Sequence, residues 1–460
     1  MTSLPERREN AFVLAGTLGI AFLGLLLLFG VSLPGAFFWI VVACAAALAF
    51  RAPEVALYGL LFNALIGLTH MADLPRIGAL SVPVAFEAVL VLAVAHRAIF
   101  RGQKLFVASP QHLLLLGLAS WIALSLIVNG RTAPENIAAL KNLYLVKMLL
   151  LFLMTNILVS LAALKRFIVA LMGCNAALLV VSFLVRSGYF GAERLSFWEN
   201  MLRTSGIVHN PNTLAFDLTT MLIFATAAFF HVKEIRMRVA LAVLIIGDFV
   251  AILTTLSRSG FVSLCCVLVF IVWSQWRDVR IFAVVMAMIF LTLFLIPEDL
   301  DFRFARVEEI KDVDRLSFAR VGLNTALHNP VFGVGLGSYM KAFDRYNNTD
   351  LTEAHPPHNM YMDLSAQIGF PALAIYLAVF AVLVGRLRAM QAQLAAAGGR
   401  GTFLHAFGWA VQAFVVNLAV FGLSGDVQFE YSVFVALGFG ILLYREHALL
   451  RGFVPPHAGR

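Results

Sequence analysis

Apolar runs of about 20 residues, separated by short polar breaks, repeat through most of this chain. A helix of that length crosses a bilayer with its internal backbone hydrogen bonds made, which lipid requires. Hydrophobic residues make up 61% of the 460 residues and charged residues 13%. A soluble domain is about half apolar and about one quarter charged. The sequence therefore excludes a soluble globular fold and predicts an all-α, polytopic transmembrane helix bundle.

The run lengths predict about fourteen spans, with about twelve as the alternative because the breaks at 31–34 and 72–81 are short. The predicted spans are 11–31, 34–50, 54–71, 82–100, 112–128, 142–161, 167–186, 212–231, 237–256, 259–275, 281–297, 359–385, 402–423 and 429–445.

Lys and Arg concentrate in the breaks on one side of this arrangement, which the positive-inside rule assigns to the cytoplasm together with both termini. The net charge of +8 suits anionic lipid head groups, so we expect membrane lipids rather than nucleic acid as partners. The opposite, periplasmic side receives 129–141, 187–211, 257–260 and the long hydrophilic segment 298–358. We accordingly predict N-terminal transmembrane helices (1–297), a periplasmic loop region with short helices (298–358) and C-terminal transmembrane helices (359–460).

Arginines occur at three positions on the predicted periplasmic side: Arg203, Arg258 and Arg320. A guanidinium is always charged and offers a planar fork of donors that matches a phosphate group. An arginine near membrane depth costs roughly 2.5–3.5 kcal/mol on insertion scales, so it usually faces a partner or a wet cavity. The alternative is that these side chains only reach the head-group layer. We expect Arg203 and Arg258 to bind an anion, with Arg320 in support, and Asp217, beyond Asn212, to face the cavity of Arg203.

A histidine follows two prolines at the predicted start of the span 359–385. Pro356 and Pro357 restrict the backbone and delay the helix, which places His358 in the first helical turn at the periplasmic mouth. A histidine with the ordinary pKa of about 6.5 accepts a proton near neutral pH. A helix N-terminus lowers that pKa further, so His358 is the candidate general base, against a capping or structural role.

The pair His355 and His358 also raises the question of zinc. A catalytic zinc site needs three protein ligands, and no third ligand is evident beyond Asp363. We therefore expect no metal and no cofactor, with His355 as a supporting polar residue.

The run Gly333–Gly337, centred on Gly335, is a candidate for binding an anion through backbone N–H groups. It is not a P-loop, because no strand precedes it and no Lys-Ser/Thr follows. Ionisable residues inside predicted spans are also functional candidates by default. They are Glu54, Glu87, Lys147, Asp217 and Asp248.

Taken together, these motifs resemble the O-antigen ligase and polysaccharide polymerase family of bacterial inner-membrane proteins. The similar pieces span about residues 200 to 385, in the family's order. Tyr339 stands where Phe is common, and Met362-Asp363 where Leu-Glu is common. The pieces are Arg203…Gly206…Asn210-Pro-Asn212, Ser257-Arg-Ser-Gly260, Asn329-Pro-Val-Phe-Gly-Val-Gly-Leu-Gly-Ser-Tyr339 and His358-Asn-Met-Tyr-Met-Asp-Leu-Ser-Ala-Gln-Ile-Gly369.

The resemblance implies a C-type membrane glycosyltransferase. Such an enzyme takes a glycan from an undecaprenyl-pyrophosphate carrier at the periplasmic face, without metal or nucleotide sugar. In this interpretation His358 deprotonates the acceptor, while Arg203 and Arg258 hold the diphosphate and stabilise its developing charge. We expect Asp363 to orient the site and Asn359, next to His358, to support it.

Several functions remain open at this point. A ligase passes the glycan to a sugar of lipid A–core, and a polymerase passes it to the next lipid-linked repeat; we favour the ligase slightly. A transporter or lipid flippase is the alternative of another class, although internal repeats and matching broken spans, which transporters tend to show, are not evident. A structural membrane protein would tolerate loss of His358 and Arg258.

Overall fold

The computed structural model describes residues 50, 52–66, 82–105, 109–131, 133–187, 195–198, 201–204, 210–274 and 311–450. The chain forms two compact units, residues 1–105 and 106–460. In the first unit, helices α3 (Pro53–Ile66) and α5 (Val82–Phe100) pack against each other. The predicted spans 11–31 and 281–297, and 34–50 except for Phe50, lie outside the described residues.

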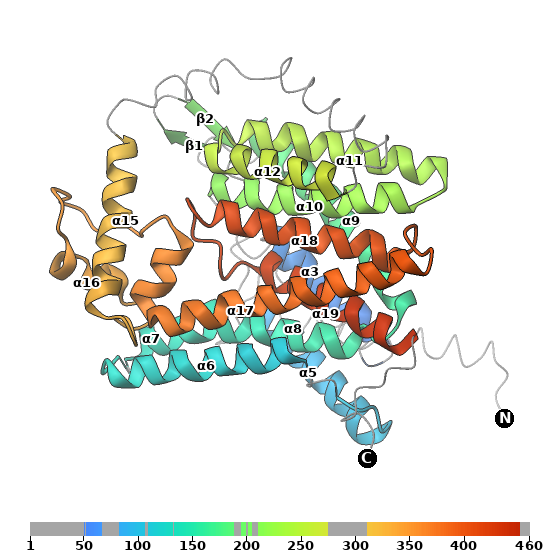
Figure 1. The fold of residues 1–460 in the computed structure, drawn as a ribbon, viewed down its shortest axis with the longest axis horizontal. Helices are drawn as coiled ribbons and strands as arrows, with labels where there is room; N and C mark the ends of the chain where they lie inside the picture. Colours follow the sequence, from blue (N-terminus) through green and yellow to red (C-terminus); the bar gives the residue numbers. More distant parts are fainter. Residues whose placement is uncertain are drawn as a thin grey trace, which may run out of the picture. The chain divides into compact units, whose positions relative to one another are not determined.

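The second unit is a helix bundle with a helical segment at one end (Figure 1). Its one sheet within the described residues is an antiparallel hairpin, β1 (Leu195–Trp198) and β2 (Met201–Thr204), in which Ser196 pairs with Arg203. The helices are α6 (Pro110–Val128), α7 (Pro134–Ala139), the π-helix η1 (Leu140–Leu145), α8 (Val146–Ile157), α9 (Leu161–Arg186), α10 (Pro211–His231), α11 (Ile235–Thr254), α12 (Arg258–Ser274), α15 (Lys311–His328), α16 (Tyr339–Tyr346), α17 (Met360–Ala396), α18 (Phe403–Phe421) and α19 (Tyr431–Leu450).

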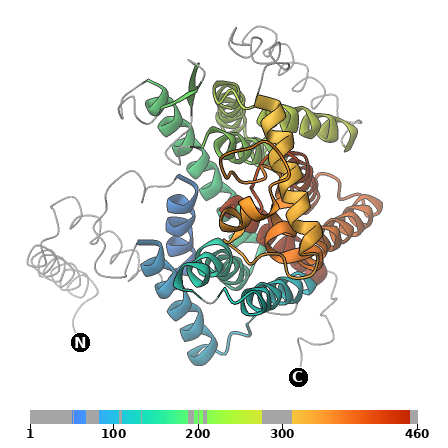
Figure 2. The same cartoon turned by 90° about the vertical axis from the view of Figure 1, so that its left-hand side faces the viewer.

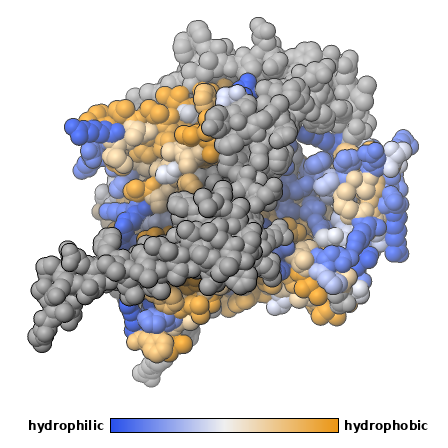
Figure 3. Space-filling view, turned by 180° about the vertical axis from the view of Figure 1, so that it is seen from behind, coloured by the Kyte–Doolittle hydropathy of each residue, from blue (hydrophilic) through white to orange (hydrophobic). Residues whose placement is uncertain are grey.

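Eight helices of the described residues are long and apolar enough to cross a membrane, and shorter apolar helices occur at Pro53–Phe62 and Arg258–Ser274. This confirms the prediction of an all-α, multi-pass membrane protein. The total of twelve to fourteen spans stays a prediction, because part of the chain is not described. Apolar side chains cover much of the described surface in Figure 3, as expected of helices that face lipid.

The ends of the spans follow local sequence signals. Asn210 caps α10 by accepting from the N–H groups of residues 212 and 213, and Pro211 takes the first helical position. A proline there leaves no helical hydrogen bond unmade. Ser109 caps α6 in the same way, followed by Pro110.

The helices differ in how much of their surface the bundle covers. In α10, 83% of the span is buried, and in α18 and α19 72%, against 33% in α11. Helices α10, α18 and α19 therefore form the centre of the bundle. Aromatic rings of these helices pack together there, with Phe224 against Phe439 and Phe216 against Phe421.

Two spans depart from their predicted limits. Helix α17 continues to Ala396, where a span 359–385 was predicted; at 37 residues it is about 55 Å long, beyond the roughly 30 Å hydrocarbon core. The predicted span 142–161 overlaps the apolar segment Pro134–Ile157, which starts earlier, includes η1 and ends four residues sooner.

The described part of the hydrophilic segment, residues 311–358, folds onto the bundle. Helix α15 packs against α17, and both α15 and α16 lie at one end of the bundle in Figures 1 and 2. Their apolar contacts form a small core with the first turns of α17, made of Val321, Ala326, Tyr339, Phe343 and Ala366. The prediction of short helices on the bundle is confirmed for this part, while the domain limits at 297 and 358 stay predictions.

Candidate active site

Helix α17 is broken after two turns, and the glycine-rich loop 329–338 fills the break. Gly369 has φ 84° and ψ 165°, which is not helical, and Pro371 follows. Pro371 has no N–H group, so it leaves the carbonyl of Gln367 without its helical donor. In a membrane such freed groups need new partners.

The backbone of the loop supplies most of these partners. The N–H groups of Val334 and Gly335 donate to the carbonyls of Ala366 and Gln367, both at 2.9 Å. In return the N–H of Phe370 donates to the carbonyl of Pro330 at 2.9 Å. The indole of Trp121 on α6 donates to the carbonyl of Ile368 at 3.0 Å.

The close approach of the two backbones requires glycine. A Cβ on Gly369 would lie 2.0 Å from the carbonyl oxygen of Val331, and a Cβ on Gly333 would lie 2.3 Å from the carbonyl carbon of Gln367. Both residues also have positive φ. The N–H of Gly335 is engaged with α17, so the prediction that it binds an anion is wrong. The glycines position α17 instead.

His358 lies just before α17. Asn359 caps the helix by accepting from the N–H groups of Tyr361 and Met362, and its amide donates to the carbonyl of Leu423 at 3.0 Å. The prediction that His358 occupies the first helical turn is therefore wrong: His358 precedes the cap residue. It has φ 48°, a left-handed conformation that histidine adopts more readily than most residues.

The imidazole of His358 faces Asp426 and remains open to solvent. Its Nδ1 lies 3.7 Å from Oδ2 of Asp426, and its side chain is 41% exposed. The ring of Phe318 packs edge-on, with 6.1 Å between the ring centroids. Burial lowers the pKa of His358 below its ordinary value, and the charges of Arg315 and His355 lower it further. His358 is thus kept neutral near pH 7.

Asp426 belongs to the segment 422–430, which links α18 to α19. Burial raises the pKa of Asp426 to about 8, and the neighbouring Asp363 raises it too. An imidazolium at His358 would favour the ionised form of Asp426, because opposite charges at this distance attract. The pair is suited to stabilise a proton taken up by His358.

Asp363 has a different environment from the one predicted. Its carboxylate accepts from the amide of Gln367 at 2.8 Å and from that of Gln428 at 2.7 Å. The Oε1 atom of Gln367 accepts in turn from the N–H of Gly337. Asp363 therefore ties α17 to the glycine-rich loop and to segment 422–430, while the carboxyl group beside His358 is that of Asp426.

Arg258 is the first residue of α12, and hydrogen bonds of the adjacent residues Ser257 and Ser259 connect it to α10 and to segment 422–430. Ser257 Oγ donates to Oδ1 of Asn212 at 2.8 Å, which joins the start of α12 to the start of α10. Gly260 lets these helices approach, because a Cβ there would lie 2.5 Å from Cβ of Ala215.

A chain of contacts runs from Arg258 to His358. Ser424 Oγ donates to Oγ of Ser259 at 2.7 Å. Ser424 lies two residues before Asp426, which faces His358 at 3.7 Å. Arg258 and His358 therefore lie at the same end of the bundle, joined by segment 422–430.

The other predicted residues are placed less centrally. The backbone of Arg203 lies in β2, which contacts α9 and α11, but its side chain is outside the described ones. Arg320 is exposed on α15. His355 is exposed, with Nε2 3.7 Å from Oε2 of Glu353. Arg315, one and a half turns before Arg320, is the α15 arginine that acts on His358.

The ionisable residues inside spans have diverse partners. Asp248 of α11 is buried and accepts from Asn175 of α9 at 2.8 Å, which ties these helices together. Lys147 of α8 lies within electrostatic reach of Glu430. Among the described residues, no three His, Cys, Asp or Glu side chains are grouped so as to hold a metal ion.

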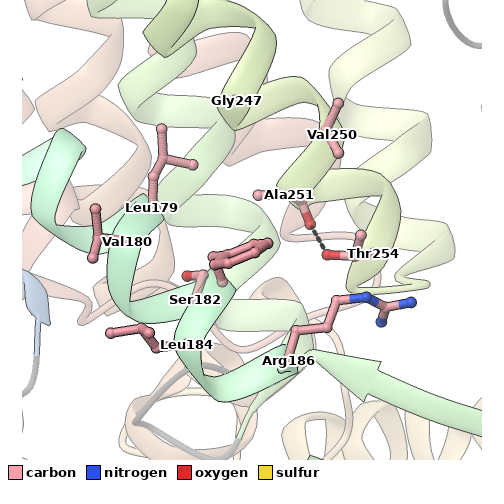
Figure 4. Close-up of a pocket in the computed structure, with 10 residues that line it drawn as sticks. Leu179, Val180, Ser182, Leu184, Arg186, Gly247, Val250, Ala251 and Thr254 are labelled. Atoms are coloured by element: carbon pink, nitrogen blue, oxygen red, sulfur yellow. Dashed lines mark hydrogen bonds between the residues drawn. The ribbon is translucent and has the colours of Figure 1, made fainter. Parts of the chain in front are cut away.

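A groove of about 470 Å³ lies between α9 and α11 (Figure 4). Its walls are mainly apolar, and Arg186 and Thr254 lie at one end, where both helices finish. Thr254 is four residues before Arg258, and β2 contacts the same two helices. The lining residues are Leu179, Val180, Ser182, Phe183, Leu184, Arg186, Gly247, Val250, Ala251 and Thr254.

Comparison with known proteins finds one family to which part of the chain is similar. Residues 240–377 match the family model described as O-antigen ligase, a range that contains Arg258, the glycine-rich loop, His358 and the break in α17. No curated protein matches the chain. The match confirms the resemblance found in the motifs: residues 240–377 are similar to the O-antigen ligase family.

Proposed function

We propose that this protein is a glycosyltransferase that moves a glycan from undecaprenyl-pyrophosphate to an acceptor sugar of lipid A–core at the periplasmic face of the bacterial inner membrane. The family supports glycan transfer of the ligase or polymerase type. The observation that carries the proposal is a half-exposed, neutral His358 beside Asp426, at the same end of the bundle as Arg258.

His358 is the proposed general base. The acceptor hydroxyl gives its proton to the imidazole, and its oxygen attacks the anomeric carbon of the donor sugar. The bond from that carbon to the phosphate oxygen breaks, its electron pair stays on the diphosphate, and the sugar is inverted. Because Nδ1 of His358 faces Asp426, Nε2 is the nitrogen that faces the acceptor, and it takes the proton when Asp426 is ionised and Nδ1 carries the ring hydrogen. Asp426 stabilises the imidazolium.

Arg258 and Arg203 are the proposed partners of the diphosphate. Arg258 starts α12, and the N-terminus of a helix adds a positive potential that favours anions. The hydrogen bonds of Ser257 and Ser259 to Asn212 and Ser424 fix the backbone on both sides of Arg258. A fixed cation stabilises the charge that develops on the leaving diphosphate, without metal in this scheme.

The groove between α9 and α11 is the proposed site of the isoprenoid tail. Its walls are apolar, and its end beside Arg186 lies towards β2 and the start of α12. A lipid diphosphate would thus place its tail among Leu179, Phe183 and Ala251 and its charged head near the arginines.

A transporter is the alternative from another class, since the broken helices of transporters bind substrates or ions. Here the freed carbonyls of α17 accept from the glycine-rich loop and from Trp121. The break is therefore filled by protein, which favours the enzyme.

The experiment is a gel of surface and lipid-linked glycans from a strain that lacks this gene, complemented with wild type or His358→Ala. We expect long chains to accumulate on the undecaprenyl carrier, with bare acceptor, in the null strain and with His358→Ala. Single repeats without a ladder would show a polymerase instead. An unchanged profile in the null strain would contradict glycan transfer.

A further inference from the structure

We propose that Lys147, buried in the membrane span α8, is a positioning residue for the reaction: it holds the junction between segment 422–430 and α19, and with it Asp426, by packing over the ring of Tyr431. This inference rests on the proposed function for its effect on catalysis, while its structural part can be tested without activity.

Segment 422–430 connects the functional elements through alternate residues. Ser424 bonds to Ser259 beside Arg258, Asp426 faces His358, and Gln428 donates to Asp363. Glu430, the last of this series, lies within electrostatic reach of Lys147. The contacts of Ser424, Asp426 and Gln428 reach the proposed substrate site. Glu430 is followed by Tyr431, whose ring packs against Lys147 in the span.

Lys147 is held by several contacts of its own. Its side chain is 9% exposed, and Nζ donates to the carbonyl of Asn142 at 3.0 Å. The ammonium also lies over the ring of Tyr431, 5.2 Å from its centroid. An amine inside a membrane span is unfavourable unless it is paired. Lys147 therefore joins α8 to the junction between segment 422–430 and α19.

The π-helix η1 gives this segment a second attachment. Tyr144 of η1 is fully buried, and its hydroxyl donates to the carbonyl of Leu115 at 2.8 Å. Its ring meets that of Phe429 edge-on, with centroids 5.8 Å apart. π-Helices often mark functional sites, and here η1 and α8 together contact residues 429 and 431.

Neighbouring charge explains why Glu430 needs a cation. Asp217 of α10 lies within electrostatic reach of Glu430, so a cation near Glu430 offsets the repulsion between these two carboxyl groups. Without the ammonium of Lys147, the ring of Tyr431 and the carboxyl group of Glu430 would lose their cationic neighbour, and we expect the junction between segment 422–430 and α19 to shift. This shift acts on the segment that carries Asp426, four residues away.

The size of the effect on catalysis follows from geometry. A misplacement of about 1 Å at a catalytic group costs up to roughly 100-fold in rate. We expect Lys147→Met to lower kcat by about 10- to 100-fold with little change in KM, because Lys147 does not touch the donor or the acceptor in this scheme. Lys147→Arg, which keeps the charge, should restore most of the rate.

The experiment compares Lys147→Met, Lys147→Arg and the double variant Lys147→Met/Glu430→Gln with wild type in detergent micelles. The matched control is Lys141→Met, an exposed lysine in η1. Two quantities are measured: hydrogen–deuterium exchange of peptides covering 422–430, and kcat and KM for glycan transfer. We expect Lys147→Met alone to exchange faster and turn over more slowly, and the double variant to recover part of both.

The outcomes separate this inference from the proposed function. Unchanged exchange in Lys147→Met would refute the anchoring of segment 422–430, whatever the activity. Faster exchange with an unchanged kcat would refute the positioning role and leave the proposed function standing. If wild type transfers no glycan, the proposed function fails, and the exchange data still decide the anchoring.

Discussion

Replacing Gly369 by alanine tests whether the glycine-rich loop holds the break in α17. The new Cβ would lie 2.0 Å from the carbonyl oxygen of Val331 and 2.4 Å from its carbonyl carbon. Both atoms are backbone, so no side chain can turn away to make room. We expect the loop and the first turns of α17 to separate.

The loss in free energy of unfolding caused by Gly369→Ala has two parts. A residue with a side chain held at φ 84° and ψ 165° costs about 1–3 kcal/mol. Separation also breaks three backbone hydrogen bonds between loop and helix, those of Val334, Gly335 and Phe370. Each contributes about 0.5–1.5 kcal/mol. The sum is about 2.5–7.5 kcal/mol, a large part of the 5–15 kcal/mol that stabilises a typical protein.

Gly398 provides the matched control. It also has positive φ, at 74°, but a Cβ there would meet no atom within 4 Å. Gly398→Ala should therefore cost only the backbone term, about 1–2 kcal/mol. The assay is the free energy of unfolding from SDS titration of the purified variants in mixed micelles. Equal losses for Gly369→Ala and Gly398→Ala would refute the proposed role of the loop.

Two further predictions concern the site. Arg315→Gln removes a charge that lowers the pKa of His358, so we expect that pKa to rise. Because His358 must be neutral to act as a base, the acidic limb of the pH profile of kcat/KM should move to higher pH. An unmoved limb would count against His358 as the titrating base. Ala251→Phe fills the groove between α9 and α11, so KM should rise for a long-tailed isoprenoid donor but not for a short-tailed one. The control Val243→Phe, outside the groove, should leave KM for both donors unchanged. Equal effects of Ala251→Phe on both donors would exclude the groove as the tail site.

The sequence predicts most of the spans because their signals are local. The length of each apolar run predicts the length of its span, and the dipeptide Asn210-Pro211 marks the start of α10. The end of α17 differs from the prediction because helix-forming residues continue past the apolar run, so that residues 386–396, which include two arginines, are still helical.

The candidate site was only partly predictable. Arg258 stands out because it lies in a tight turn between two apolar runs, and His358 because it follows two prolines at the start of a span. Asp426 does not, since a short polar loop between two spans is expected to contain such residues. Its role depends on a contact with a residue 68 positions earlier, which no local pattern encodes.

The choice between Arg315 and Arg320 shows the same limit. Both lie on α15, and the sequence pattern singled out Arg320 but not Arg315. Which arginine acts on His358 depends on how the helix is rotated on α17, and Pro357 packed near Gly322 contributes to that rotation.

The most direct measurement is the rate of glycan transfer by purified wild type and His358→Gln, from a lipid-linked donor to an acceptor, at saturating donor. Glutamine keeps the size and polarity of the side chain but cannot act as a base near neutral pH. The account predicts that kcat falls by about 10²- to 10⁴-fold while KM for the donor stays close to that of wild type. A variant that transfers glycan at the wild-type rate would contradict it.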